Sequence, residues 1–188
     1  MEEIKMKNIS IIGSGSWATA LTKILLNNVN ELCWYNREEE DIDYIKKYKH
    51  NPRYLSSVEF DVSKLKLTSS VEEAINFADI VILAVPSAFC NNTLKDLPTD
   101  ILKNKLVFSA IKGIIPEHNL IVGEYLNTMW NVPLSNIGVI TGPCHAEEVA
   151  MEKLSYLTIA CSETSNADIL AEMMRCRYIK VTSSDDIY

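Results

Sequence analysis

The sequence lacks the excess of positive charge that is typical of nucleic-acid-binding proteins. Its 188 residues include 18 Lys and Arg against 25 Asp and Glu, which gives a net charge of −7. A chain with this charge is repelled by a polyphosphate backbone at long range. We therefore expect no nucleic-acid partner.

Closely spaced cysteines are also absent. The five cysteines stand at least 15 residues apart, so they form no Cys-x-x-Cys pair for a metal or for redox chemistry. They are Cys33, Cys90, Cys144, Cys161 and Cys176. Their odd number and wide spacing predict no metal site and favour a reducing, cytoplasmic location.

The sequence has no long apolar run and no targeting signal. The longest stretch without a formal charge, residues 125–146, is interrupted by three Asn, two Pro and two Gly, whereas a spanning helix needs about 20 mostly apolar residues. The first ten residues mix both charges and contain no segment apolar enough for a signal peptide. We expect neither a membrane segment nor export.

No internal repeat, low-complexity tract or Gly/Ser linker divides the chain. At this length, folding buries roughly 70% of the surface that the unfolded chain exposes, so a core forms without a disulfide or a metal. We predict one domain over residues 1–188.

Short apolar runs alternate with helical patterns along the chain. Ile9, Ile11 and Ile12 form a short β-branched strand pattern, and apolar residues recur at helical spacing from Ser16 to Leu25. Glu31–Tyr35 is a second strand pattern, which completes a βαβ unit. Further strands are predicted at 65–68, 79–85, 106–110, 137–141, 156–160 and 178–181, and further helices at 38–49, 71–77, after residue 116, and at 145–151 and 166–175. Ser69 or Ser70, each with an acid three residues later, is the predicted cap of the 71–77 helix. This alternation predicts an α/β fold with a doubly wound, mainly parallel sheet.

A glycine-rich turn separates the first strand from the first helix. Gly13-Ser14-Gly15-Ser16-Trp17-Ala18 fits the G-x-G-x-x-A pattern of dinucleotide-binding proteins. Gly13 permits the tight turn, Gly15 allows a pyrophosphate to approach the backbone, and Ala18 lets the helix pack close to the sheet. A plain glycine turn and the turn of a SAM-dependent methyltransferase are the alternatives.

The end of the second strand bears on the choice between NAD and NADP. An acid normally binds the adenosine ribose there, but this sequence has Asn36 and Arg37. Arg37 can pair with a 2′-phosphate, so NADP should be tolerated, and a preference for NADP over NAD stays open. A solvated loop cation beside Glu38 explains Arg37 equally well.

Three further strand ends carry candidate site residues, because ligands of open α/β sheets bind beyond the carboxyl ends of the strands. Ser87, after Pro86, leaves room beside a nicotinamide ribose, although an ordinary proline turn explains it as well. A lone lysine is usually a solvated surface residue, but Lys112 has few polar neighbours and suits a phosphate or carbonyl oxygen. Cys144 and His145 stand at a helix start, which lowers a thiol pKa. Adjacent residues there point in different directions, however, and no third residue orients them, so cysteine catalysis is disfavoured.

These motifs together resemble bacterial-type, NAD(P)-dependent glycerol-3-phosphate dehydrogenase. The motifs span nearly the whole chain and are specific through their order and spacing. They are Gly-Ser-Gly-Ser-Trp-Ala-Thr-Ala from Gly13, Asn-Pro-Arg-Tyr-Leu from Asn51, Val-Pro-Ser from Val85, Ile-Lys-Gly-Ile from Ile111 and Gly-Pro-Cys-His-Ala-Glu-Glu from Gly142.

The resemblance implies a Rossmann-like domain that binds NAD or NADP, and a role for each matching residue. The implied cofactor-binding residues are Gly13, Gly15, Ser16, Trp17, Asn36, Arg37, Ser87, Lys112 and Ala146. The implied substrate-binding residues are Lys112, Gly142 and Cys144. Cys144 departs from the hydroxyl residue that is commoner in the family, and a thiol is a poor hydrogen-bond donor.

The resemblance also implies a reaction and a second domain. The family interconverts sn-glycerol 3-phosphate and dihydroxyacetone phosphate, supplies glycerophospholipid precursors and is expected to form homodimers. Its general acid/base lysine lies in a helical C-terminal domain that we do not find in this chain, so no catalytic residue is assigned here. A non-catalytic dinucleotide-binding or sensing module, and a related two-domain hydroxy-acid dehydrogenase, are the competing interpretations.

Overall fold

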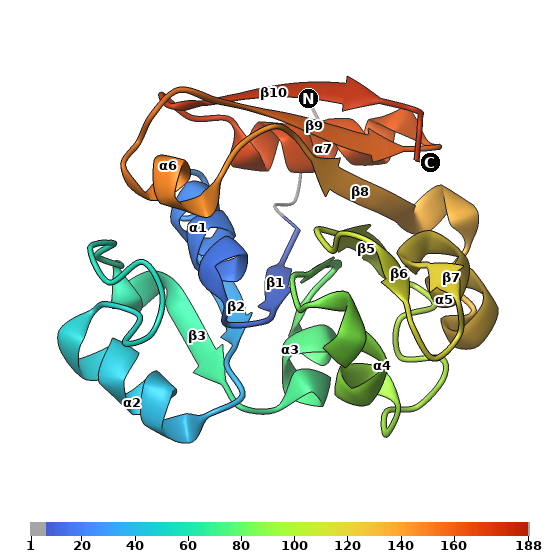
Figure 1. Cartoon of the computed structure of the whole chain (residues 1–188), viewed down its shortest axis with the longest axis horizontal. Helices are drawn as coiled ribbons and strands as arrows, with labels where there is room; N and C mark the ends of the chain where they lie inside the picture. The colour runs from blue at the N-terminus through green and yellow to red at the C-terminus, as the bar shows by residue number, and fades with distance from the viewer. Residues whose placement is uncertain (1–6, 188) are drawn as a thin grey trace.

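A computed structural model describes residues 7–187 of the chain. Strands and helices alternate along it in the predicted α/β order (Figure 1). The strands are β1 (Ile9–Ile12), β2 (Leu32–Tyr35), β3 (Leu65–Thr68), β4 (Ile80–Leu83), β5 (Leu106–Ser109), β6 (Ile114–Ile115), β7 (Leu120–Ile121), β8 (Ile137–Thr141), β9 (Ser155–Cys161) and β10 (Ile179–Ser184). The α-helices are α1 (Ser16–Leu25), α2 (Glu39–Tyr48), α3 (Val71–Phe77), α4 (Ser87–Leu94), α5 (Val122–Trp130), α6 (Ala146–Ala150) and α7 (Thr164–Met174), with 3₁₀ turns at Val62–Lys64 and Leu134–Asn136.

The main sheet has eight strands in the order β10-β9-β8-β5-β4-β1-β2-β3. Neighbouring strands are parallel except β8 and β9, which run antiparallel. The doubly wound, mainly parallel sheet is therefore confirmed. Because β1 and β4 lie in its middle and are covered on both faces, all of their residues are buried; β4 is a continuous apolar run, and β1 is apolar except for Ser10.

Helices pack on both faces of the sheet and give it two cores. One core joins the sheet to α1, α6 and α7, and the other joins it to α3, α4 and α5. In Figure 1, α1 and α6 lie together beside the upper part of the sheet, and α3 and α4 lie below it. The parallel strands β1, β2, β4 and β5 end at one edge, where the glycine turn follows β1.

Local signals account for several element boundaries. Ser70 precedes α3, and its Oγ accepts a hydrogen bond from the Glu73 N–H at 3.2 Å, as the predicted cap requires. Helix α4 starts directly after Pro86, which stands at its N-cap, where the sequence indicated only a turn. The β6–β7 hairpin also has no signal in the apolar pattern, because each strand has only two residues.

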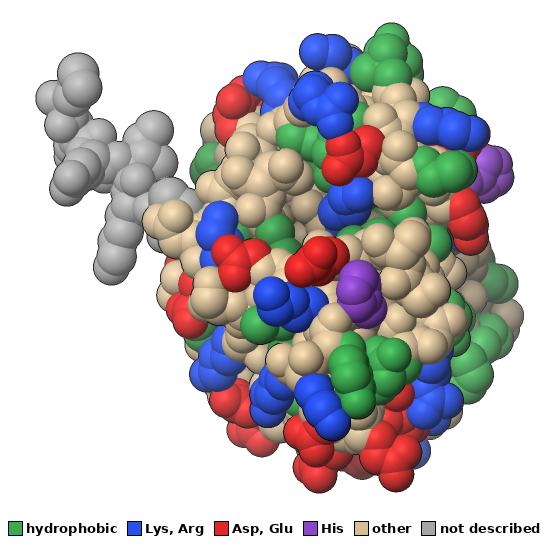
Figure 2. Space-filling view, turned by 90° about the vertical axis from the view of Figure 1, so that its left-hand side faces the viewer, with side chains coloured by type: hydrophobic (Ala, Val, Ile, Leu, Met, Phe, Trp, Pro, Cys, Tyr) green, Lys and Arg blue, Asp and Glu red, His purple; other side chains and the backbone are tan. Residues whose placement is uncertain are grey.

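The face that Figure 2 shows carries acidic and basic side chains intermingled rather than separated into patches of one sign. Within residues 7–187, no helix has both the length and the apolarity needed to cross a bilayer.

Candidate functional site

The two glycines of the turn between β1 and α1 are there for different reasons. Gly13 has a φ of +134°, and a Cβ built on it would lie 2.4 Å from the Ala84 carbonyl oxygen. Gly15 has a φ of −74° and a ψ of −177°, which any residue adopts, and a Cβ there would meet nothing within 4 Å. The fold therefore requires glycine at position 13. At position 15 it does not, and the space beside Gly15 contains no protein atom.

The start of α1 offers unused hydrogen-bond donors beside that space. Among the described residues, none accepts a hydrogen bond from the backbone N–H groups of Ser16, Trp17 and Ala18, and the helix has no side-chain cap. Its first turn also contains no acidic residue. Free N–H groups at the positive end of a helix bind anions such as phosphate, so the turn can hold a pyrophosphate.

Two cavities flank the turn. The larger, of about 510 Å³, is lined by Gly13, Ser14 and Gly15 on one side and by residues after β2 and β4 on the others. The smaller, of about 250 Å³, is lined by the next two residues, Ser16 and Trp17, and by the ends of β5 and β8. An elongated ligand that crosses the turn would thus place one end in each cavity.

Asn36 and Arg37 follow β2; Arg37 lines the larger cavity, whereas Asn36 lines neither cavity. Asn36 is only 1% exposed, and no described residue forms a hydrogen bond with its Nδ2 or Oδ1. A buried amide without partners is rare, because it forfeits hydrogen bonds that water would have made. Arg37 lines the cavity, but its Nε lies 2.7 Å from Glu38 Oε1, so this guanidinium is already paired.

Several residues that line the larger cavity were not singled out from the sequence. They are Tyr35, Arg53, Tyr54, Phe89, Asn92 and Thr93. Phe89 is 56% exposed, which is unusual for a large apolar side chain and leaves its ring free for a ligand. It was missed because α4 was not predicted; Arg53 and Tyr54 belong to the Asn51–Leu55 motif, whose place in the fold its local pattern does not indicate.

The smaller cavity gathers most of the residues expected at the later strand ends. Its lining includes Lys112, Gly142, Cys144 and Ala146. Lys112 is exposed and forms no ion pair within the described part of the chain, so its ammonium is available to an anion. Ser87 lines neither cavity; its Oγ lies 3.9 Å from where a Cβ on Gly113 would be.

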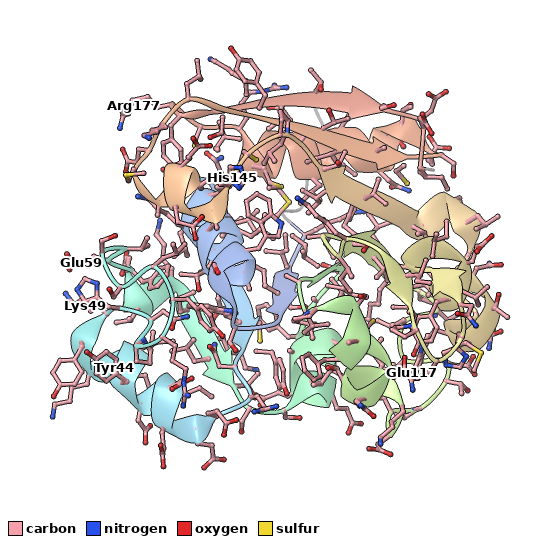
Figure 3. The ribbon with its side chains drawn as sticks, viewed as in Figure 1. Tyr44, Lys49, Glu59, Glu117, His145 and Arg177 are labelled. Carbon is pink, nitrogen blue, oxygen red and sulfur yellow. The ribbon has the colours of Figure 1, made fainter. Side chains whose placement is uncertain are left out.

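The local chemistry does not favour Cys144 as a nucleophile. Burial raises the pKa of the Cys144 thiol, and its own backbone N–H and the charge of Lys112 only partly offset this. His145 is the N-cap of the five-residue helix α6 and forms no side-chain cap hydrogen bond; it is exposed at the start of α6 (Figure 3). A thiol with a raised pKa stays protonated at neutral pH.

Metal chemistry has no counterpart in the described residues. Within 7–187, no group of three His, Cys, Asp or Glu side chains is arranged to hold a metal ion. Free N–H groups at the start of α1 and the exposed ammonium of Lys112 suit the two cavities to an anionic, elongated ligand that crosses the turn.

Comparison with known proteins agrees with this arrangement. A family model described as "NAD-dependent glycerol-3-phosphate dehydrogenase N-terminus" matches residues 8–167. Among curated proteins, a glycerol-3-phosphate dehydrogenase [NAD(P)+] of Exiguobacterium is 33% identical over 183 residues, which is 97% of this chain and 53% of the relative. The Bacillus subtilis protein of the same name is 30% identical over 183 residues and is covered to 53%.

A solved structure of Plasmodium falciparum glycerol-3-phosphate dehydrogenase superimposes on this chain with a TM-score of 0.84 at 27% sequence identity. The match covers 96% of this chain and 53% of that one. The chain thus spans about half the length of the relatives that it matches.

Proposed function

Because the chain belongs to the family of N-terminal domains of NAD-dependent glycerol-3-phosphate dehydrogenases, we propose that residues 1–188 form the cofactor-binding domain of such an enzyme. The whole enzyme would interconvert sn-glycerol 3-phosphate and dihydroxyacetone phosphate and supply precursors of glycerophospholipids. The nicotinamide, when bound, supplies the hydride chemistry, so this chain's residues bind, orient and neutralise charge.

One observation carries the cofactor assignment: the space beside Gly15. A residue with ordinary backbone angles and no neighbour within 4 Å of its missing Cβ has no structural need to be glycine. The need arises if a ligand fills the space, and the free N–H groups of α1 favour an anion there. The pyrophosphate of NAD(H) or NADP(H) has the required charge and position.

The unpaired amide of Asn36 further supports a dinucleotide. Asn36 does not line the larger cavity in the free chain; its buried oxygen and nitrogen would reach the hydroxyls of the adenosine ribose through a side-chain movement when a cofactor occupies the end of β2. Arg37 and Arg53 line the same cavity, but Glu38 and Asp41 pair with them. The cavity therefore suits NADH, and a 2′-phosphate would have to compete with a carboxylate for either guanidinium.

In the smaller cavity we assign the nicotinamide and the three-carbon phosphate. Ala146 would stand beside the nicotinamide ring, while Gly142 and Cys144 would contact the substrate. Lys112, whose ammonium has no carboxylate partner among the described residues, would hold a substrate oxygen or phosphate and stabilise negative charge there.

The proton-transfer step is assigned to none of these residues. In this family a lysine of the helical second domain acts as the general acid/base, so we expect the 188-residue chain to bind cofactor and to turn over negligibly. A homodimer is expected only for the longer protein.

Calorimetric titration of the purified chain with NADH and with NADPH tests the proposal. We expect saturable binding of both, with NADH at least as tight as NADPH. If the folded chain binds neither cofactor, the cofactor assignment is wrong. If this chain alone clearly reduces dihydroxyacetone phosphate, the assignment of the proton donor to the second domain is wrong.

A further inference from the structure

The glycine turn is held by hydrogen bonds to three successive carbonyl groups. Trp34 Nε1 donates to the Gly13 carbonyl at 2.7 Å, and Asn51 Nδ2 donates to the Ser14 carbonyl at 3.1 Å. The Gly15 carbonyl accepts from both the N–H and the Oγ1 of Thr19, each at 2.9 Å. All three carbonyl groups of the turn therefore point into the protein and accept hydrogen bonds there.

The direction of these carbonyls determines the direction of the N–H groups. In a trans peptide, the C=O of one residue and the N–H of the next point in opposite directions, and the described chain contains no cis peptide. The N–H groups of Ser14, Gly15 and Ser16 therefore point away from the protein, and no described residue accepts a hydrogen bond from them. They are the donors that a pyrophosphate on the turn would use.

Asn51 differs from the other two donors because it comes from neither β2 nor α1. Its side chain is 2% exposed, and its amide group forms four hydrogen bonds. Nδ2 donates to the Ser14 carbonyl and to Thr19 Oγ1, while Oδ1 accepts from the N–H groups of Arg53 and Tyr54 at 2.9 and 3.1 Å. An amide has two N–H donors and two lone pairs, so this one is saturated.

The oxygen and the nitrogen of the Asn51 amide bind two different segments that line the larger cavity. The oxygen holds the 51–54 turn, from which Arg53 and Tyr54 line the larger cavity, and the nitrogen holds the glycine turn, which lines it from the opposite side. An asparagine that only stabilised the fold could form its hydrogen bonds anywhere in the core, including far from the space for the ligand. Here three of the four bonds go to Ser14, Arg53 and Tyr54, which line the larger cavity, and the fourth goes to the buried Thr19 hydroxyl.

We propose that Asn51 is a positioning residue for the cofactor: it fixes the Ser14 peptide so that the Gly15 N–H faces the pyrophosphate before the cofactor arrives. The inference rests on the proposed function, because it assumes that a dinucleotide binds on the turn. Pre-orienting the donors in the free protein removes an ordering cost from binding.

Two variants separate the functions of the amide. Asn51→Asp keeps both acceptor positions for the 51–54 turn but loses the donors to the glycine turn, and Asn51→Ala loses both sets without adding charge. Asn28→Ala is the matched control. Asn28 Nδ2 likewise donates across the chain to two backbone carbonyls, those of Met173 and Arg175, at 3.0 and 2.7 Å, but it follows the far end of α1.

NADH dissociation constants are measured by calorimetry at 10 °C, and unfolding temperatures by circular dichroism. Adenosine, which lacks the pyrophosphate, is titrated in parallel by NMR. We expect NADH to bind about tenfold more weakly to both Asn51 variants, with adenosine affinity changed less than twofold. Asn28→Ala should bind NADH as the wild type does.

Folded Asn51 variants that bind NADH as tightly as the wild type would overturn the positioning role. An equal loss for adenosine and NADH would also overturn it, because the defect would then be one of the whole cavity. If Asn51→Ala does not fold, Asn51→Leu, which is similar in size to asparagine and uncharged, takes its place, because a weaker NADH affinity of the Asp variant alone would also follow from charge repulsion of the pyrophosphate. A wild-type chain that does not bind NADH overturns the proposed function itself, which is a separate result.

Discussion

Replacing each glycine of the turn with alanine separates the structural role of the turn from its binding role. At Gly15 the new methyl group meets no protein atom within 4 Å and the backbone angles are ordinary. Alanine there restricts the unfolded chain, which stabilises the fold by about 0.4–1 kcal/mol. It is a poorer N-cap than glycine, which costs a similar amount. We expect the unfolding temperature to stay within about 2 °C of the wild type.

The effect on the cofactor should be large by contrast. The methyl group would occupy the space that the pyrophosphate needs, and it would lengthen or break at least one hydrogen bond to a charged oxygen. Such a bond contributes about 1.5–3 kcal/mol, so NADH should bind about 10- to 150-fold more weakly to Gly15→Ala. Calorimetry with NADH measures this directly.

Gly13→Ala, by contrast, should mainly destabilise the fold. Its methyl group would lie 2.4 Å from the Ala84 carbonyl oxygen, and its φ is +134°. Overpacking costs about 1–3 kcal/mol and the strained backbone a further 1–3 kcal/mol, so the unfolding temperature should fall by about 5–20 °C. A stable Gly15→Ala that binds NADH as the wild type does would refute the reasoning, as would a Gly15→Ala that unfolds as readily as Gly13→Ala.

Three further predictions concern charge and thiols. Glu38→Ala frees Arg37 from its ion pair and should raise the affinity for NADPH relative to NADH about two- to fivefold in paired titrations; an unchanged ratio would mean that Arg37 does not face the 2′-position. Burial raises the pKa of the Cys33 and Cys90 thiols from 9.0 to about 12. The folded chain therefore keeps protons that the unfolded chain releases, and the stability that these thiols contribute is complete below pH 9 and is lost between pH 9 and 12. Thermal unfolding should show the midpoint falling across that range, and a flat profile would contradict the burial argument. Because burial also raises the pKa of Cys144, iodoacetamide at pH 7.5 should label it more slowly than a cysteine in an unfolded peptide, as followed by mass spectrometry; faster labelling would restore the nucleophile hypothesis.

Local sequence patterns were enough to predict the α/β fold. Apolar runs such as Ile9–Ile12, the helical spacing after Ser16 and the cap at Ser70 are properties of neighbouring residues, and each is found where the pattern indicates it. The glycine turn could be located for the same reason, because its residues are contiguous and its place between strand and helix is readable from the pattern. Its association with NAD(P) came from the resemblance of several such motifs taken together.

The tertiary structure decided what those residues face. Both turn glycines look alike in the sequence, and only the approach of Ala84, the residue after β4, shows that Gly13 is structural while Gly15 borders open space. The saturated amide of Asn51 reaches the glycine turn, and the exposed ring of Phe89 lines the larger cavity, from segments 37 or more residues beyond Ser14 in the chain. Periodicity reports the face of a strand or helix that is buried, but contacts between distant segments depend on how the chain crosses the sheet, which no local pattern contains.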